Sequence, residues 1–212
     1  LKKHGLMENT LIVFLSDNGG HKASPNKPLR GKKGTFWEGG LRVPFCMRWD
    51  GRIKSGQIYR RPVIALDILP TAMAAAGVSA DPAWELDGVD LLPYVRDGKA
   101  GDPHEALHWA WGPRTAIRRG DLKAVSMNKG KTFMLFDLAK DIGEQHDLAA
   151  ERPEELAALT KMHRQWEKAL MPPQWGWNKA LGYRDPAFGK PKSYQREQTP
   201  RPAGTTRKGN EQ

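Results

Sequence analysis

The sequence predicts an α/β protein in which an antiparallel sheet follows a strand-and-loop region, and three observations predict it. An apolar run at 11–15 precedes a polar Ser-Asp-Asn-Gly-Gly loop, four short strand-like runs lie within 106–136, and an amphipathic pattern occupies 153–170. Runs of β-branched and aromatic residues bounded by turn formers are typical of strands, whereas apolar residues at helical spacing are typical of a packed helix. Strands and helices should therefore be mixed along the chain.

Composition limits the classes of protein to which this chain can belong. With 212 residues, 39% of them hydrophobic, the chain can form one substantial core. No apolar stretch approaches the roughly 18 residues of a membrane span. The single cysteine, Cys46, excludes an internal disulfide and a multi-cysteine zinc site. Because the chain begins with Leu1 rather than methionine, we expect it to be a fragment or a processed piece.

The formal net charge of +10 is unevenly distributed along the chain. Residues 1–61 carry about +9, residues 62–170 about −4 and residues 171–212 about +5. Basic zones suggest an anionic partner, such as a small anionic substrate, a sulfated polysaccharide or nucleic acid. The sequence contains no recognised nucleic-acid motif, so nucleic acid is not the expected partner. A noncatalytic basic module that binds polyanions is the alternative from another functional class.

The apolar run at 11–15 predicts a strand buried on both faces, as in parallel sheets. Asp17 and Asn18 follow this strand, and in open α/β sheets ligands bind at the carboxyl ends of strands. Two interpretations stay open from these residues alone. Asp, Asn and the two glycines that follow are typical of a tight turn, but carboxylate and amide oxygens are also the ligands that Ca²⁺ and Mg²⁺ prefer.

Two further elements are predicted in the first half of the chain. Residues 41–49 are typical of a strand in which Pro44 marks a start, an edge or a bulge. Within it, Cys46 is expected to be a small buried side chain. Residues 63–76 carry apolar side chains at helical spacing and end at Gly77, a residue typical of helix C-caps.

From residue 104 the pattern changes to short strand-like runs separated by glycine-containing turns. Closely spaced strands joined by short turns favour an antiparallel meander, and the helix at 153–170 has an apolar face that can cover it. We therefore predict one part at 1–103, a small α+β part at 104–170, and an extended or disordered basic tail at 171–212. The strand-like runs are 106–111, 115–119, 122–126 and 132–136.

Two segments together carry a family resemblance. A Ser-Asp-Asn-Gly loop at 16–19 is followed at 32–44 by Lys-Lys-Gly-Thr-Phe-Trp-Glu-Gly-Gly-Leu-Arg-Val-Pro. In order and spacing these segments resemble the sulfatase family of the alkaline-phosphatase-like superfamily, with Lys32 standing where glycine is usual. The resemblance implies that 1–103 is the carboxy-terminal part of an alkaline-phosphatase-like α/β domain. It implies equally that 104–170 is a small carboxy-terminal subdomain with a packed terminal helix.

The resemblance also implies a site. Asp17 and Asn18 match positions that bind Ca²⁺ in the family, and Lys33 matches the position that contacts the sulfate. A lysine ammonium suits a tetrahedral anion because it is a compact charge with three donors. His21 lies beside the double glycine and could reach the substrate.

The nucleophile that the resemblance implies is missing from this chain. Sulfatases use a formylglycine made from cysteine or serine in a Cys/Ser-x-Pro/Ala-x-Arg motif, and the sequence contains neither this motif nor the family's amino-terminal metal-binding carboxylates. Cys46 is followed by Met47 and Arg48, so it does not fit the motif. We therefore expect a calcium-dependent sulfuric ester hydrolase as the parent protein and an inactive isolated chain. Glu38 and Arg42 are expected to form a structural pair that steadies the lysine loop.

Substrate and location follow from the resemblance alone. It implies a sulfated small molecule or glycan as substrate and a periplasmic, secreted or lysosomal location, and it leaves the oligomeric state open. A phosphoester or phosphonate hydrolase of the same superfamily is the close alternative. The upstream nucleophile would distinguish the two, since formylglycine indicates sulfate esters and an unmodified threonine or serine indicates phosphate esters.

Overall fold

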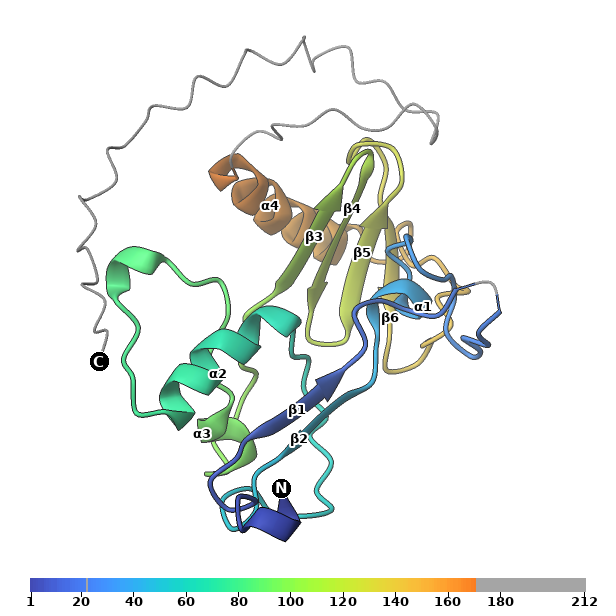
Figure 1. Cartoon of the computed structure of the whole chain (residues 1–212). Helices are drawn as coiled ribbons and strands as arrows, with labels where there is room; N and C mark the ends of the chain where they lie inside the picture. Colours follow the sequence, from blue (N-terminus) through green and yellow to red (C-terminus); the bar gives the residue numbers. More distant parts are fainter. Residues whose placement is uncertain (22, 171–212) are drawn as a thin grey trace, which may run out of the picture. The chain divides into compact units, whose positions relative to one another are not determined.

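The computed structural model describes residues 1–21 and 23–170 of the chain (Figure 1). The expected tail at 171–212 lies outside the described residues. Within the described ranges, strands and helices are mixed along the chain, as the sequence predicts. None of the described helices is long and apolar enough to cross a membrane.

A two-stranded antiparallel sheet carries the loop of the first motif. The strand β1, Ile12–Leu15, pairs with β2, Phe45–Arg48, so that Leu15 lies opposite Phe45. Pro44 directly precedes β2, which is a position that a proline tolerates because it has no N–H to donate within the strand. The polar loop begins at Ser16, directly after β1, and therefore lies at one end of this small sheet.

Two expectations for this sheet are wrong. The strand β1 is not buried between parallel neighbours, because its described partner is antiparallel and the Phe14 side chain is 65% exposed. Cys46 is exposed rather than buried. The two errors have one cause: Phe14 and Cys46 are opposite each other in the register and therefore project from the same open face of the sheet.

The predicted helix at 63–76 is present but shorter. The helix α2 spans Ile68–Ala75, and a 3-10 turn at Ala65–Asp67 precedes it. This turn is fixed by the buried Asp67 carboxylate, which accepts a hydrogen bond from the N–H of Ile64 at 2.8 Å. Gly77 follows α2 with a φ of 71°, the left-handed conformation expected of a helix C-cap. The remaining helical elements are α1 at Glu38–Leu41, α3 at Leu92–Val95, and 3-10 turns at Lys2–His4 and Pro82–Trp84.

The second sheet is the antiparallel meander that the sequence predicts. Its strands pair in sequence order, β3-β4-β5-β6. The helix α4, Pro153–Ala169, begins with a proline and carries Glu154 and Glu155 in its first turn, all of which favour a helix N-terminus. Figure 1 shows α4 lying across this sheet, where it contacts β4 and β5. The strands are β3 at Leu107–Trp111, β4 at Arg114–Arg119, β5 at Leu122–Ser126 and β6 at Met134–Asp137.

Alternating side chains give the second sheet two buried faces. One face packs on α4, where Leu159 enters the apolar cluster. The other face packs on Phe36 and Trp37, which directly precede α1. The Trp37 and Phe136 rings meet edge-on, with their centroids 5.7 Å apart. The loop that leads into α1 is therefore attached to the second sheet. The alternating sets are Ile117, Ala124 and Leu135 toward α4, and Ala116, Val125 and Phe136 toward α1.

Candidate functional site

Backbone hydrogen bonds join the loop after β1 to α1 and to the loop before it. The N–H of Gly19 donates to the carbonyl of Gly40 at 3.1 Å, and the N–H of Lys33 donates to the carbonyl of Gly20 at 3.0 Å. Each bond pairs peptide groups that would otherwise need water or another partner. The loop of Asp17 and Asn18 and the loop of Lys33 are thus held side by side.

Glycine is required where these two loops meet. A Cβ atom on Gly19 would collide with the carbonyl of Gly39 in the other segment, and one on Gly40 would collide with the carbonyl of Thr35 within its own segment. Rotation of a side chain cannot relieve a collision between Cβ and backbone, so the two backbones approach this closely only because side chains are absent. Close packing, in addition to turn formation, therefore explains the paired glycines of both motifs.

Asn18, His21 and Lys33 line one cavity of about 670 Å³. Arg42 also lines this cavity, and none of the described residues around it is acidic. The volume falls within the range of roughly 300–1,000 Å³ that is usual for small-molecule sites. Lysine, arginine and imidazole groups around a cavity with no described carboxylate in its wall favour an anionic ligand.

Asp17 lies next to a cavity-lining residue but is not itself among those that line the cavity. Its Oδ1 accepts a hydrogen bond from Nδ2 of Asn18 at 2.8 Å. Ser16 fixes the same loop, because its Oγ donates to the carbonyl of Asn18 at 2.9 Å. The carboxylate and the amide are therefore neighbours on one loop, and of the two it is Asn18 that reaches the cavity.

The pair of Asp17 and Asn18 fits part of a calcium shell. Ca²⁺ prefers carboxylate and amide oxygens and takes about six to eight of them. Across 1–21 and 23–170, no group of three or more His, Cys, Asp or Glu side chains is placed to hold a metal ion. Two such residues would fill only part of that shell, so a calcium ion held here would take its other oxygens from water, substrate or another segment.

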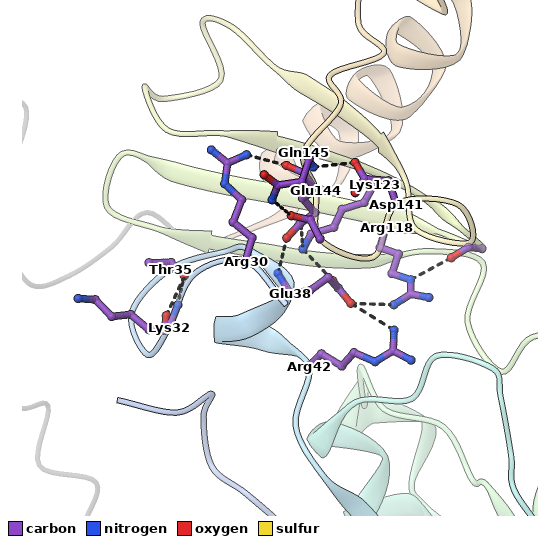
Figure 2. A network of polar contacts seen from close by, with 12 residues as sticks. Arg30, Lys32, Thr35, Glu38, Arg42, Arg118, Lys123, Asp141, Glu144 and Gln145 are labelled. Carbon is purple, nitrogen blue, oxygen red and sulfur yellow. Dashed lines mark hydrogen bonds and ion pairs between the residues drawn. The ribbon is translucent and has the colours of Figure 1, made fainter. Parts of the chain in front are cut away.

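A buried ion cluster connects α1 to the second sheet (Figure 2). Lys123 of β5 is fully buried, and its Nζ lies 2.8 Å from Oε1 of Glu38 and 2.9 Å from Oε1 of Glu144. The other carboxylate oxygen of Glu144 accepts a hydrogen bond from the N–H of Glu38 at 2.6 Å. Arg118 and Arg42 approach the second oxygen of Glu38, at 3.4 and 3.6 Å. The cluster therefore neutralises carboxylates that have been removed from water.

Burial makes the pairing in this cluster necessary. Removal from water raises the pKa of the Glu144 carboxyl, and the nearby ammonium group of Lys123 lowers it. A buried carboxylate needs both a counter-charge and hydrogen bonds to remain ionised at moderate cost. The backbone of Glu144 is fixed too, because its carbonyl accepts a hydrogen bond from Nη1 of Arg30 at 2.8 Å. The segment from Arg30 to Glu38 is thereby held against the second sheet.

Of the residues in this cluster, only Glu38 and Arg42 were predicted from the sequence. The expected pair of Glu38 and Arg42 is present, but the closer partners, Lys123 and Glu144, were not predicted. They lie 85 and 106 residues from Glu38, and no local periodicity relates positions so far apart. The available signal was a lysine standing among apolar residues in a predicted strand.

The turn between β3 and β4 touches the loop that carries Lys33. A guanidinium N–H of Arg114 donates to the carbonyl of Gly34. The ring of Trp111 lies 4.0 Å from the position that a Cβ on Gly34 would occupy, and its centre is 5.6 Å from the Arg114 guanidinium. The second sheet thus places an aromatic and a cationic side chain against Gly34, the residue after Lys33, and sequence reasoning singled out neither.

The buried His163 and the half-buried His108 form a separate cluster between the second sheet and α4. Nδ1 of His108 lies 3.1 Å from Nδ1 of His163, and both rings lie against Trp166. Nε2 of His163 also hydrogen-bonds Oγ1 of Thr115. Burial lowers the pKa of both His108 and His163 to about 4, so both imidazoles are neutral at pH 7. Their contacts attach α4 to the sheet.

Residues 1–78 match the sulfatase family. The chain is 41% identical over 112 residues to the uncharacterised sulfatase YdeN of Escherichia coli, covering 51% of this chain and 20% of that protein. It is 31% identical over 194 residues to human arylsulfatase A, covering 74% of this chain and 38% of that protein. Among solved structures, Ps i-CgsB in complex with k-i-k-neocarrahexaose matches with a TM-score of 0.76 and 33% identity.

The chain spans only part of these relatives. The match to Ps i-CgsB covers 86% of this chain and 42% of that chain, and the two curated relatives are covered over 20% and 38% of their length. This mixed α/β chain, with its small antiparallel sheets and terminal helix, therefore corresponds to a portion of these longer proteins.

Proposed function

The chain belongs to the sulfatase family, and we propose that it is the carboxy-terminal part of a calcium-dependent sulfuric ester hydrolase. In this proposal 1–103 contributes to an alkaline-phosphatase-like α/β domain and 104–170 forms its small subdomain. The nucleophile is a formylglycine supplied by sequence outside this chain, because no formylglycine motif occurs within it. The location is periplasmic, secreted or lysosomal.

The observation that carries the proposal is the cavity shared by Asn18, His21 and Lys33. Asn18 and Lys33 come from the two motifs that resemble sulfatase motifs, His21 follows the first of them, and backbone hydrogen bonds hold the two loops together. The described part of the cavity wall is cationic and contains no acid. A sulfate monoester is a tetrahedral anion, and such a wall attracts it and orients it.

Each of these residues has a task in ester cleavage. Lys33 donates hydrogen bonds to sulfate oxygens and holds sulfur in line with the attacking oxygen. His21 is a second donor on the same cavity and contacts the substrate. Asp17 and Asn18 would hold Ca²⁺, which, when bound, neutralises charge on the sulfate oxygens. The isolated chain lacks the nucleophile, so it should hydrolyse no aryl sulfate above background.

The substrate class in this proposal is a sulfated glycan or a smaller sulfate ester. One solved relative, Ps i-CgsB, is a complex with an oligosaccharide, and that protein is 33% identical to this chain. The basic surface of the chain, with a formal net charge of +10, also favours a polyanionic substrate.

The test uses the parent protein with its formylglycine and measures hydrolysis of 4-nitrophenyl sulfate, with 4-nitrophenyl phosphate in parallel. Lys33→Ala should lower kcat/KM by about 10²–10³-fold, as removal of a donor to a developing charge does. Lys32→Ala is the matched control, because Lys32 is the neighbouring lysine and does not line the cavity. Equal losses in both variants would contradict the role of Lys33, and faster hydrolysis of the phosphate ester would favour the phosphoester hydrolase.

A further inference from the structure

We propose that Trp111 and Arg114, at the turn between β3 and β4, form a subsite for the sugar ring that carries the sulfate ester. The inference rests on the proposed sulfatase function and specifies where the glycan part of the substrate binds. It assigns to the second sheet a direct share in substrate recognition.

Position is the first argument. Arg114 donates a hydrogen bond to the carbonyl of Gly34, the residue that follows Lys33, and the Trp111 ring lies against the same glycine. Neither residue lines the 670 Å³ cavity itself, whereas Lys33 does. A ligand whose sulfate is bound by Lys33 and whose body extends along this loop therefore reaches Trp111 and Arg114 next.

Chemistry is the second argument. The Trp111 side chain is 41% exposed, which leaves part of a large flat apolar surface accessible to a ligand. A sugar ring has an apolar face of C–H groups that can lie on such a surface, while its hydroxyl, carboxylate or further sulfate groups need polar partners. Arg114 has five N–H donors, and one hydrogen bond to Gly34 leaves others for the ligand. The segments 31–35 and 111–114 contain no acidic residue that would repel an anion.

Rigidity is the third argument. Gly34 lies against the Trp111 ring and has no side chain, so it leaves space beside the indole. Trp111 is the last residue of β3 and lies opposite Arg114, the first residue of β4. A binding residue on the end of a paired strand is held more firmly than one on a free loop.

The experiment compares two substrate types in the parent protein. Substrates are 4-nitrophenyl sulfate, which has no sugar, and the best-cleaved member of a panel of carrageenan, chondroitin and heparin oligosaccharides. The variants are Trp111→Ala, Trp111→Phe, and Trp84→Ala as the control, because Trp84 is 56% exposed and belongs to the separate 3-10 turn at Pro82–Trp84. The measured quantity is the ratio of kcat/KM for the oligosaccharide to kcat/KM for the aryl sulfate.

Trp111→Ala should lower this ratio about tenfold, mainly through a higher KM for the oligosaccharide, as loss of an aromatic contact does. Trp111→Phe should recover part of the loss because it restores a ring, and Trp84→Ala should not change the ratio. An unchanged ratio in Trp111→Ala would overturn the subsite. Cleavage of aryl sulfate with no cleavage of any oligosaccharide would overturn the glycan assignment, whereas cleavage of neither substrate would instead overturn the proposed function.

Discussion

Replacing Lys123 by methionine removes the ammonium group that lies between the buried carboxylates of Glu38 and Glu144. Methionine has a similar length and no charge, so the change leaves little cavity and isolates the electrostatic effect. Breaking a buried ion pair by removing one partner costs about 3–5 kcal/mol. We expect the lower end, about 3 kcal/mol of unfolding free energy, because Arg118 still contacts Glu38 at 3.4 Å and the loss falls mainly on Glu144.

Urea denaturation of the 212-residue chain at pH 7 measures this loss, and thermal unfolding should show a fall in Tm of roughly 10 °C. The matched control is Lys140→Met, which removes a lysine from an exposed ion pair. The Lys140 side chain is 77% exposed, and its Nζ lies 3.9 Å from Oδ2 of Asp137. That exposed pair should contribute at most about 0.5 kcal/mol. Adding Glu144→Gln to Lys123→Met should recover part of the stability, because it removes the carboxylate left without its counter-charge. A loss below about 1 kcal/mol in Lys123→Met would refute the reasoning that this cluster depends on its lysine.

The remaining predictions concern pH and calcium. The pKa of His163 is about 4 in the folded protein, below its value of 6.5 in the unfolded chain. The unfolded chain therefore binds a proton first as the pH falls, so the free energy of unfolding is at its full value above pH 6.5 and decreases as the pH falls toward 4. Urea titrations at pH 7 and pH 5 should differ by about 2 kcal/mol from this residue alone, and His163→Gln should reduce that difference; an equal pH dependence in both proteins would contradict the assignment. Because we propose only two calcium ligands within this chain, Asp17 and Asn18, a low-millimolar Ca²⁺ concentration should raise its Tm by less than about 2 °C. Scanning fluorimetry with Mg²⁺ as a comparison checks this, and a rise of about 5 °C specific to Ca²⁺ would mean that the chain contains a fuller site.

The elements that depend on local pattern were predictable from the sequence. The four strands of the second sheet and the helix α4 lie within a few residues of their expected positions. The signals that predict them, turn residues and apolar spacing, depend only on residues that are close together in the sequence. Gly77 ended α2 as expected for the same reason. The start of α2 was missed because it depends on a buried carboxylate, Asp67, whose burial is a tertiary property.

Burial and long-range contact were not predictable in this way. Phe14 and Cys46 look like core residues, but their exposure depends on what covers the first sheet. For the candidate site, the motifs nominated Asp17, Asn18 and Lys33, and the neighbouring loop nominated His21. All but Asp17 line one cavity, and their roles remain predictions. The partners of Glu38 and the contact of Trp111 with Gly34 required the three-dimensional structure, since each joins segments far apart in the chain.

The sequence separation within the ion cluster has a consequence for the order in which the protein folds. The second sheet pairs neighbouring strands through short turns, and such local pairing closes small loops that form quickly. By contrast, the contacts of Glu38 with Lys123 and Glu144 close loops of 85 and 106 residues. During synthesis the loop of Lys33 therefore leaves the ribosome long before the residues that fix it in place. Until Glu144 has been made, the segment from Arg30 to Glu38 lacks its contacts with the ion cluster, so the cation-lined cavity gains this support late in translation.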